Sequence, residues 1–565
     1  MQRLSRHPVL GVLAVCVLSM GIYFYISSFH VRKICSKLDT SKIKSCPDDL
    51  SILLMESRGQ SSTLTELSIE DAEVIEGKLV FKPKGEMKWT TSIPIPWDAN
   101  PFQDRPWQMS LESWRLMDGY LTQYEQTKDV TYIKTCLDIA KDWLDFHVQK
   151  KKKSTFGWND MSTAYRADRL SKLLDLAAQA NVFTTQEILI LVELAELHVD
   201  FLTEPKNINT DNHGVFEMAG LARLCKTAPY ISKCFRIDEW ILEKMDQLTK
   251  NQFSDDGLQL EHSFGYHLWM TKIYQDLIDE NTVPISMASK ALLAKAVENT
   301  DWLYDPAGRM VPVGDTAPHI KKTNLSKIDL PKPFFKIFPT AGLAVVRTPH
   351  QGLWFYAFHH SKSHKHDDDL GFYLWDEGQP LLIDGGKYAY NTDNKRKYVY
   401  SRSAHNTVMI PDVPKSNRRS PYGSGIKTIE HTSSKYVLTG EVSYEGGITH
   451  HRILTYHAGK SLLIDDHITG TTTKVGVNFL IDPSLQKKTA TTSQIVFENN
   501  RVYLIIESKT PGCIADSAYG EDLNQSLRGW YTSSPGKISP TWNVVYNCPS
   551  DKHIITEIRY GNHKR

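Results

Sequence analysis

The sequence predicts an α+β chain in which a helical domain precedes an antiparallel β-sandwich. From about Pro106 to residue 303, apolar residues recur at three- and four-residue spacing, which is typical of amphipathic helices. From about residue 340 to the end, short β-rich runs alternate with turn residues at intervals of about 8 to 12 residues, as in an all-β sandwich. A charge-free apolar segment near the N-terminus adds a membrane anchor to this plan.

The apolar segment covers residues 9–29, and its roughly 21 residues are enough to cross about 30 Å of hydrocarbon. Arg3 and Arg6 precede it and no clean cleavage site follows, so we predict an uncleaved signal anchor, with a signal peptide as the alternative. Basic residues also follow the segment, so loop charge does not decide its orientation. We expect a single-pass membrane protein whose folded part lies in the periplasm or on the secretory lumen or extracellular side.

The domains are predicted as a cytoplasmic tail with the anchor (1–30), a stem (31–100), a helical domain (101–330) and a β-sandwich (331–565). Thr185 is predicted to cap one of the helices. The helical pattern alone is compatible with a bundle, a solenoid or a ring of hairpins. Helices are predicted at 106–126, 129–149, 162–181, 185–203, 211–226, 235–252, 264–280 and 286–303.

The predicted strands are short runs with β-branched and aromatic residues, bounded by turn residues. A lysine- and proline-rich connection near 320–340 separates them from the helices. The runs are AGLAVVRT, LWFYAFHH, GFYLWDEG, HNTVMI, KYVLTGEVSY, HRILTYH, SLLIDDHI, VGVNFLI, SQIVFE and RVYLIIES.

Composition narrows the class of ligand only slightly. Lysine and arginine number 66 against 65 acidic residues, so the net charge of +1 does not indicate a nucleic-acid partner. The 13 Trp and 25 Tyr include residues that could stack on the apolar faces of sugar rings, although large cores also use aromatics. The close cysteine pairs Cys35/Cys46 and Cys225/Cys234 are either disulfides of an oxidising compartment or buried thiols.

Metal- and proton-binding side chains concentrate between residues 364 and 407. His364, His366, Asp368, Asp384 and His405 fall within this stretch, around two predicted strands joined by a turn at residues 377–378. Polar residues at the ends of neighbouring strands are how a sheet assembles a site from residues distant in sequence. A histidine-rich loop that arose by chance is the competing interpretation.

Two upstream motifs are weaker when taken alone. Asn212 and His213 open a predicted helix, where a simple helix cap would have the same sequence. Glu261, Tyr266 and His267 lie at the start of another helix, where such residues are more often part of a core or a plain surface.

Together these motifs resemble the heparinase II/III-like polysaccharide lyases, a family related to certain alginate lyases and to dermatan sulfate epimerases. The resemblance covers about residues 100–480 and is most specific between the His-x-His and His-Asn-Thr motifs. One departure is Gly371, where the family more often has serine. The resemblance implies an incomplete (α/α) toroid joined to a β-sandwich. The carrying motifs are Asn212-His213, Glu261-x-Ser263-x-x-Tyr266-His267, His364-x-His366-x-Asp368, Pro380-Leu-Leu-Ile-Asp384-x-Gly386 and Arg402-Ser-Ala-His405-Asn406-Thr407.

The resemblance also implies catalytic roles. Asn212, with His213, would disperse the charge of a uronate carboxylate, which stabilises the anion formed when the neighbouring proton is removed. Tyr266 would protonate the leaving glycosidic oxygen and serve as base for some stereochemistries, and His364 would be the other acid or base. The substrate groove would lie between the two domains. The residues predicted to bind substrate are Trp158, Arg166, Glu261, His267 and Arg402.

His366, Asp384 and His405 would hold a divalent metal in the sandwich, as some family members do. Two imidazoles and a carboxylate suit zinc, and the family's metal is chiefly structural. Asp368 would orient a ring nitrogen. No organic cofactor is expected.

The leading function implied is a lyase that cleaves a uronic-acid-containing glycan by β-elimination. A uronyl C5-epimerase would use the same residues, and a non-catalytic glycan-binding protein could keep the same fold. A cupin-like metal oxygenase also has a His-x-His motif, but it would not need Asn212 or Tyr266. The expected partners are an anionic polysaccharide and, through the anchor, a membrane, with no nucleic acid. The sequence does not predict an oligomeric state.

Overall fold

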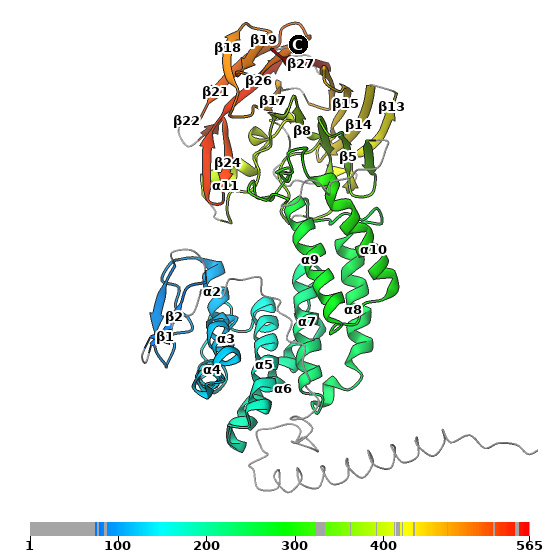
Figure 1. Cartoon of the computed structure of the whole chain (residues 1–565). Helices are drawn as coiled ribbons and strands as arrows, with labels where there is room; N and C mark the ends of the chain where they lie inside the picture. Colours follow the sequence, from blue (N-terminus) through cyan, green and yellow to red (C-terminus); the bar gives the residue numbers. More distant parts are fainter. Residues whose placement is uncertain are drawn as a thin grey trace, which may run out of the picture. The chain divides into compact units, whose positions relative to one another are not determined.

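The computed structural model describes residues 74–563 apart from 76–77, 84–86, 323–333, 362, 391–392, 412, 414–418, 421, 433–434, 472, 524–525 and 549–552 (Figure 1). The described chain forms two compact units. The first runs to Thr249 and includes Gln275–Met287, whereas the second consists of Lys250–Tyr274 and Ala288–Arg565. The second unit therefore includes the N-terminal part of one long helix as well as the sheets.

The predicted anchor at residues 9–29 and most of the predicted stem lie outside the described residues. Within the part of the chain that is described, no helix combines the length and the apolar character needed to cross a membrane.

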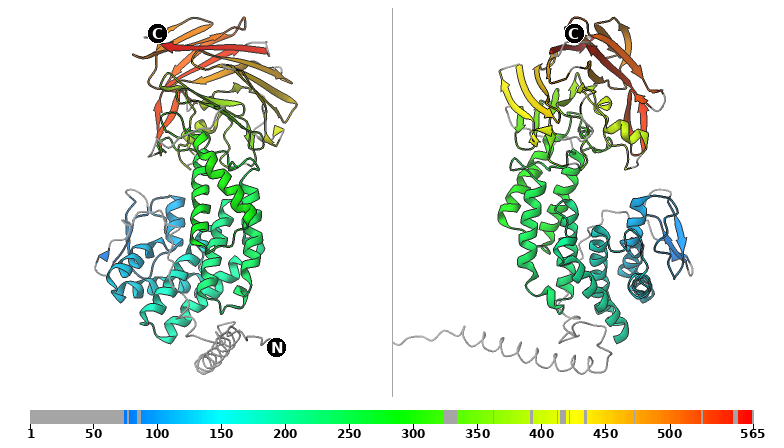
Figure 2. Two further views of the ribbon diagram at one scale, coloured as in Figure 1. Left: turned by 45° about the vertical axis from the view of Figure 1, so that its right-hand side comes forward. Right: turned by 180° about the vertical axis from the view of Figure 1, so that it is seen from behind.

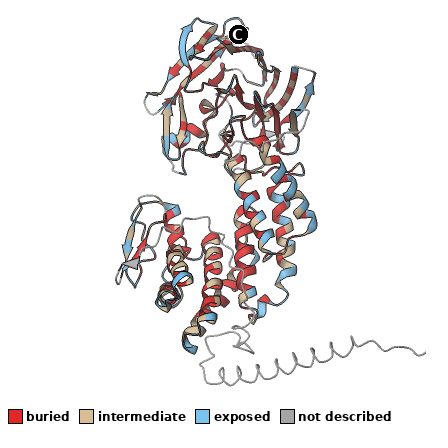
Figure 3. Ribbon diagram, in the orientation of Figure 1, coloured by how far each residue is buried: buried red, intermediate tan, exposed pale blue. Residues whose placement is uncertain are grey.

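Helices dominate the first unit, as predicted, and α5 packs against both α6 and α7. Most of the predicted helices agree with the observed ones to within a few residues. Figure 3 shows how strongly α5 and α7 are buried. The bounds are α2 (Arg105–Glu112), α3 (Asp118–Thr127), α4 (Val130–Leu144), α5 (Asp160–Ala180), α6 (Thr185–Leu202), α7 (Asn212–Thr227), α8 (Ile237–Gln252), α9 (Phe264–Glu280), α10 (Met287–Asn299) and, within the sheet region, α11 (Asn394–Tyr400).

Two local details differ from the prediction. The first predicted helix is broken between α2 and α3, where Trp114 adopts a left-handed backbone with φ of 58°. The helix cap predicted at Thr185 is formed by Thr184 instead. Thr184 and Glu187 exchange side-chain and backbone hydrogen bonds in a capping box, which satisfies amide groups that the first turn would otherwise leave unpaired.

The second unit is built from antiparallel sheets, which confirms the predicted β-rich half (Figure 2). A nine-stranded sheet has the order β11-β14-β15-β16-β27-β20-β19-β18, with β13 also paired to β14. A four-stranded sheet has the order β10-β17-β26-β21, and a five-stranded sheet has the order β4-β5-β6-β8-β9. Several C-terminal strands of these sheets, β21, β26 and β27 among them, were not predicted.

The strands of the second unit have the following bounds: β4 (Phe335–Phe338), β5 (Leu343–Arg347), β6 (Gly352–Tyr356), β7 (Phe358–His359), β8 (Gly371–Asp376), β9 (Gln379–Leu382), β10 (Val408–Met409), β11 (Arg419–Ser420), β12 (Gly423–Ser424), β13 (Ile426–His431), β14 (Lys435–Tyr444), β15 (Ile448–His457), β16 (Ser461–Thr469), β17 (Val475–Leu480), β18 (Gln486–Ala490), β19 (Gln494–Glu498), β20 (Val502–Ser508), β21 (Ile514–Tyr519), β22 (Glu521–Leu523), β23 (Ser526–Arg528), β24 (Trp530–Ser534), β25 (Lys537–Pro540), β26 (Trp542–Cys548) and β27 (His553–Asn562). In the first unit, a small sheet contains β1 (Val74–Ile75), β2 (Lys78–Phe81) and β3 (Trp89–Thr91).

The burial pattern of the strands explains the layers. Residues of β14 and β15 alternate between buried and partly exposed, so one face of the large sheet covers a core. Every residue of β5, β6 and β8 is buried, which places the five-stranded sheet inside the unit. The predicted turn between β8 and β9 is confirmed: Glu377 and Gly378 both have positive φ, as the tightest hairpin turns require.

Two disulfides link described cysteines. Cys225 and Cys234 form one bond, which decides between the two interpretations of that pair. Cys513 and Cys548 form a second bond, between the segment leading into β21 and the end of β26. Cys136 is a buried free thiol, and the pair Cys35/Cys46 lies outside the described residues.

Candidate active site

A buried carboxylate, Asp315, lies at the centre of the candidate site in the second unit. Its Oδ2 accepts a hydrogen bond of 2.7 Å from Nδ1 of His364, and its Oδ1 lies 3.1 Å from Nε2 of His366. The guanidinium of Arg396 binds both oxygens, at 2.7 and 2.9 Å. The hydroxyl of Tyr400 also donates to Oδ2, at 3.0 Å. One carboxylate therefore orients both histidines of the His-x-His motif.

These contacts decide the charge of Asp315. Burial by itself would raise the pKa of this carboxyl, but hydrogen bonds from His364, His366 and Arg396 outweigh burial and hold the pKa well below its usual range. Asp315 is thus a carboxylate at all ordinary pH values, and Arg396 compensates its charge within the buried site.

The loop that carries Asp315 also builds the start of α9. A Cβ on Gly314 would lie 2.0 Å from the carbonyl oxygen of His262, so only glycine allows the two backbone segments to approach this closely. The hydroxyl of Thr316 accepts a hydrogen bond of 3.0 Å from the backbone amide of Gly265, and it lies 3.0 Å from the hydroxyl of Ser263. The same loop therefore fixes the histidines and the first turn of α9.

Tyr266, in that first turn, lies directly against His364. The two rings stack with centroids 4.0 Å apart, and Glu261 approaches Nε2 of His364 to 3.5 Å. The hydroxyls of Tyr266 and Tyr390 are 2.5 Å apart, and Nζ of Lys387 donates to Tyr390 at 2.7 Å. Burial, followed by the neighbouring Tyr390, raises the pKa of Tyr266, so its hydroxyl stays protonated at neutral pH.

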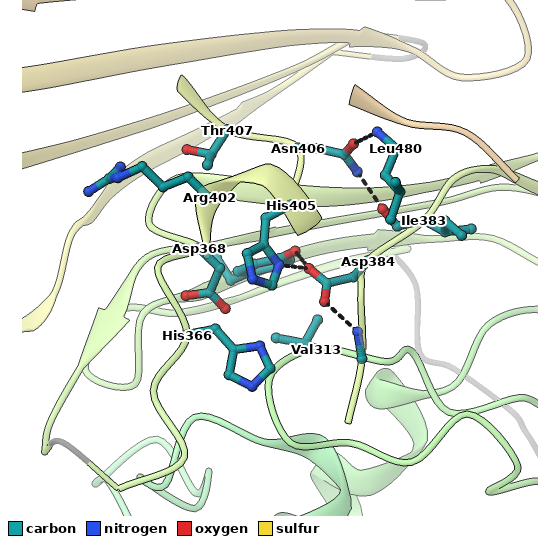
Figure 4. A network of polar contacts seen from close by, with 12 residues as sticks. Val313, His366, Asp368, Ile383, Asp384, Arg402, His405, Asn406, Thr407 and Leu480 are labelled. Atoms are coloured by element: carbon teal, nitrogen blue, oxygen red, sulfur yellow. Dashed lines mark hydrogen bonds and ion pairs between the residues drawn. The ribbon is translucent and has the colours of Figure 1, made fainter. Parts of the chain in front are cut away.

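The predicted metal ligands also come together. His366, Asp384 and His405 are buried, and each offers a ligand atom within 4.8 Å of the other two (Figure 4). Asp384 lies two residues after the end of β9 and accepts hydrogen bonds of 2.6 Å from Tyr356 and 2.8 Å from Nδ1 of His405. Burial would raise the pKa of Asp384, but the contacts with His405 and the hydrogen bond from Tyr356 outweigh burial and lower the pKa. The group can hold a metal ion whose identity the geometry does not specify.

The orphaned ring nitrogens test whether the residues fit a metal. Nδ1 of His366 and Nε2 of His405 are buried and have no hydrogen-bond partner among the described residues. The opposite nitrogen of each ring faces a carboxylate, Asp315 for His366 and Asp384 for His405. Metal-binding histidines commonly have this arrangement, because the carboxylate fixes the tautomer and leaves the other nitrogen available. The pair of histidines therefore fits a metal.

Asn406 holds the segment that carries His405. Arg452 donates a 2.8 Å hydrogen bond to the carbonyl of Asn406 and ties this segment to the large sheet. The amide side chain of Asn406 bonds to the backbone of three further residues, which Figure 4 shows in part: Phe372 and Ile383, which accept, and Leu480, which donates.

Asn212 and His213 lie in the first unit, at the start of α7. Asp211 caps the helix by accepting a 3.0 Å hydrogen bond from the amide of His213, and Asn212 is buried. Nδ1 of His213 is 3.0 Å from Asp160, which also accepts from Asn209 at 2.8 Å. Burial opposes protonation of His213, but the bond to Asp160 outweighs it and raises the pKa. Both the cap and a polar cluster are therefore present at this helix start.

Arg166 does not lie where direct sugar binding would require it. Its side chain is buried, and burial lowers its pKa to about 9. Trp158 is 36% exposed, although one face of its ring stacks on Phe201. The burial of Arg166 therefore contradicts the prediction that its side chain contacts substrate directly. Trp158, by contrast, keeps a solvent-facing surface. The donors of Arg166 bond to His198, the carbonyl of Glu112 and the carbonyl of Gly157.

His267 is buried away from solvent, contrary to the prediction that it binds substrate, whereas the predicted substrate contact of Arg402 stays a prediction. His267 is only 1% exposed; its Nδ1 accepts from the amide of Gln259, and Nε2 lies 3.0 Å from the carbonyl of Ala296. Burial lowers its pKa to about 4, so it is a neutral core residue. The guanidinium of Arg402 lies 4.7 Å over the ring of Tyr444 and supports the sheet. Glu261, by contrast, is within the site.

The sequence motifs did not reveal Asp315, Arg396, Lys387 or Tyr390. Asp315 stands alone in the segment VPVGDTAP, 81 residues from Arg396, and no local pattern links them. Lys387 and Tyr390 belong to the sequence KYAY, which directly follows the Asp-Gly-Gly motif. Their closeness in sequence to that motif was the only signal that could have pointed to them.

Comparisons with known proteins agree with these features. Residues 331–546 match the family model described as heparinase II/III-like, C-terminal, and residues 59–289 match that of the heparinase II/III N-terminus. Heparan sulfate lyase HepC from Pedobacter heparinus has a similar fold, with a TM-score of 0.63 and 16% identity over 86% of this chain and 82% of that one. No curated protein sequence matches the chain.

Two heparinase III structures are also similar. One, a heparinase III gene product with methylated lysines, has a TM-score of 0.67 and 15% identity over 91% of this chain and 88% of its own. The other, a crystal structure of heparinase III, has a TM-score of 0.66 and 17% identity over 83% of this chain and 79% of its own. At these identities the likeness is one of fold.

Proposed function

Because the chain belongs to the heparinase II/III-like family, we propose that it is a polysaccharide lyase that cleaves a uronic-acid-containing glycan, of the glycosaminoglycan class, by β-elimination. The observation that carries this proposal is the stacked pair of Tyr266 and His364, with the tyrosine kept protonated by burial. The similar structures include a heparan sulfate lyase and a heparinase III, which favours the same class of substrate. The helices would then correspond to the incomplete (α/α) toroid of the family.

The reaction requires a base for the proton on C5 of the uronate and an acid for the leaving oxygen on C4. Asp315 accepts the hydrogen of Nδ1 of His364, which leaves Nε2 as the nitrogen that can take a proton. In this proposal the C5 proton moves to Nε2, and the C5–H electrons form the C4=C5 double bond. The C4–O4 bond breaks, and O4 receives the phenolic proton of Tyr266.

Removal of a proton beside a carboxylate places a second negative charge next to the first, so the substrate carboxylate needs hydrogen-bond donors. We assign this role to Asn212 and His213, following the family motif. The raised pKa of His213 favours the cationic ring, and the N-terminus of α7 adds a partial positive charge. Trp158 and Glu261 remain proposed substrate contacts.

A structural divalent metal, which we propose to be zinc, would be held by His366, Asp384 and His405. Such an ion would supply a fixed crosslink between the loop before β8, the end of β9 and the segment before β10. The chain's own part is to orient both imidazoles with carboxylates, which contact one nitrogen of each ring and leave the other nitrogen available.

We expect His405→Ala to lose bound metal, because it removes one of only three protein ligands. Metal content by plasma mass spectrometry should fall from about one ion per chain to near none. A saturating ligand at about 100 times its Kd stabilises a fold by about 2.7 kcal/mol, so a chelator should lower the melting temperature of the wild type but not of the variant. His467→Ala, at an exposed histidine on β16, is the matched control. Equal metal content in both variants would refute the ligand assignment.

The lyase proposal is tested by incubating the protein with heparan sulfate, heparin, chondroitin sulfate, dermatan sulfate, hyaluronan and alginate. We expect at least one to give a product with the ultraviolet absorbance of an unsaturated uronate. Incorporation of deuterium at C5 from heavy water without that absorbance would instead identify an epimerase. Binding of a glycan without either signal would identify a glycan-binding protein. Either of these two outcomes would reject the lyase proposal.

For the location of the enzyme we propose that residues 9–29 anchor the chain in a membrane and that the folded part lies in an oxidising compartment. The disulfides Cys225–Cys234 and Cys513–Cys548 support the second statement, because such bonds are rare in the cytosol. Resistance of the membrane-bound protein to alkaline extraction, together with labelling by an impermeant reagent, would test both statements, and a soluble protein would reject the anchor.

A further inference from the structure

Two side chains next to the stacked pair, Lys387 and Tyr390, form a line of hydrogen bonds that leads to Tyr266 and that the proposed reaction does not use. Nζ of Lys387 donates a 2.7 Å hydrogen bond to the hydroxyl of Tyr390, and that hydroxyl lies 2.5 Å from the hydroxyl of Tyr266. The ammonium also lies 4.2 Å from the ring centre of Tyr390 and 5.6 Å from that of Tyr266. A cation thus contacts both tyrosines, one of them directly at its oxygen.

The hydrogen-bond donors that these side chains carry determine which group donates and which accepts in each contact. An ammonium has only hydrogens to offer, so the oxygen of Tyr390 must accept from Lys387. Tyr390 has one hydrogen of its own, and the next oxygen is that of Tyr266. When Tyr390 donates to Tyr266, the hydrogen of Tyr266 is free to point at a bound substrate. The separation of 2.5 Å is at the short end of the range for a bond between two hydroxyls.

The backbone holds Lys387 in this position. Its amide donates a 3.1 Å hydrogen bond to the carbonyl of Thr316, the residue that follows Asp315. The preceding Gly386 has φ of 65° and donates to Asp384 at 3.1 Å. Lys387 is therefore fixed to the two segments that carry the buried carboxylates, and its side chain extends from that point toward Tyr390.

We infer that Lys387 and Tyr390 form a relay that brings positive charge to the phenolic oxygen of Tyr266 and so makes this tyrosine a stronger acid toward the leaving glycosidic oxygen. The inference rests on the proposed function of Tyr266. Lys387 and Tyr390 are positioning residues, because they act on the substrate only through Tyr266.

The relay addresses an electrostatic problem of the site. Tyr266 faces the carboxylates of Glu261 and Asp315, and both oppose formation of a tyrosinate. His364 stacks on one face of its ring, and Arg396 lies 5.6 Å from the ring of Tyr390, with its charge paired to Asp315. Lys387 is thus the cation that reaches the phenolic oxygen through a hydrogen-bonded path.

Every proton that moves in this reaction is accounted for. As the C4–O4 bond breaks, O4 takes the proton of Tyr266, and the resulting tyrosinate accepts a stronger hydrogen bond from Tyr390. Lys387 donates to the oxygen of Tyr390 throughout and keeps its own proton. Tyr266 regains a proton when the C5 proton held by His364 is returned by way of solvent, so no other reactant is consumed.

The first experiment measures leaving-group dependence in the full-length protein. We expect Lys387→Met and Tyr390→Phe to lower kcat on a polysaccharide by about tenfold or more with KM within about twofold, because they weaken an acid that contributes about 10²–10⁴-fold. On a substrate with a nitrophenolate leaving group at C4, which needs no proton, both deficits should largely disappear. Lys387→Arg should recover most of the rate. A raised KM with unchanged kcat, or equal deficits on both substrates, would overturn the relay.

The second experiment does not depend on catalysis. With 3-fluorotyrosine placed at position 266, we expect Lys387→Met and Tyr390→Phe to move the fluorine resonance in the same direction, since the first removes the positive charge and the second removes the hydroxyl that links this charge to Tyr266. Lys487→Met is the matched control, because Lys487 lies 4.4 Å from the ring of Trp542 on the sandwich surface. A resonance unmoved by Lys387→Met would refute the relay. If the resonance moves but no glycan is cleaved, the relay holds and the lyase proposal fails.

Discussion

The variant Tyr266→Phe is expected to lose about 10²–10⁴-fold of kcat, because it removes only the hydroxyl that protonates the leaving oxygen. This loss corresponds to about 3–5 kcal/mol of the activation barrier. The fold should survive, since the phenyl ring can keep its stack on His364 and its edge contact with Trp269. We expect the free energy of unfolding to change by less than about 1 kcal/mol. Initial rates of unsaturated product and a urea titration measure the two quantities.

Tyr519→Phe is the control for this experiment, because Tyr519 is 44% exposed on β21 and no role is proposed for it. Its rate should remain close to that of the wild type. If Tyr266→Phe keeps more than about a tenth of the rate, another group protonates O4, and His364 or Tyr390 would be the group to test next. If the rate falls and the fold also unfolds, the loss has a structural cause and the catalytic assignment is rejected.

The helices were predictable because their amphipathic spacing is carried by the local sequence. The break at Trp114 was not, since its left-handed backbone is a tertiary choice that apolar periodicity does not encode. The missed strands have weak patterns for a similar reason. All residues of β18, QKKTA, are exposed, and β21, IADSAY, is mostly exposed or partly so, so neither shows the apolar alternation that identifies a half-buried strand.

The candidate site was predictable where its residues share a motif. Only Lys365 separates His364 from His366 in the sequence, and the conformation of one loop brings both histidines to Asp315. Asp315 itself was hidden, because its role exists only when the chain has folded and Arg396 has joined it. Residue type also misled at Arg166, since a long cationic side chain can satisfy all its donors inside a helical core as well as on a ligand.

Asp315→Asn should destabilise the second unit by about 3–5 kcal/mol at neutral pH, the usual result when one partner of a buried ion pair is removed. The side chain of Asp315 is 0% exposed and that of Arg396 is 11% exposed, so water cannot take over the lost contact. The amide would also present hydrogens to groups that are themselves donors. Because Asp315 holds one ring nitrogen of His366, we further expect metal affinity to fall by about 10–100-fold. Urea unfolding and metal titration measure the two effects.

The pH dependence of that loss follows from the lowered pKa of Asp315. A carboxyl whose folded pKa is depressed contributes its full stability above the unfolded value, about 3.9, and loses it as the pH falls toward the folded one. The difference between wild type and Asp315→Asn should therefore be constant from about pH 5 to 8 and shrink below about pH 4. Asp516→Asn, which breaks a surface pair with Arg528, should cost no more than about 1 kcal/mol. Equal losses in the two variants would mean that Asp315 does not hold the site together, and the assignment of one carboxylate to both histidines would fail with it.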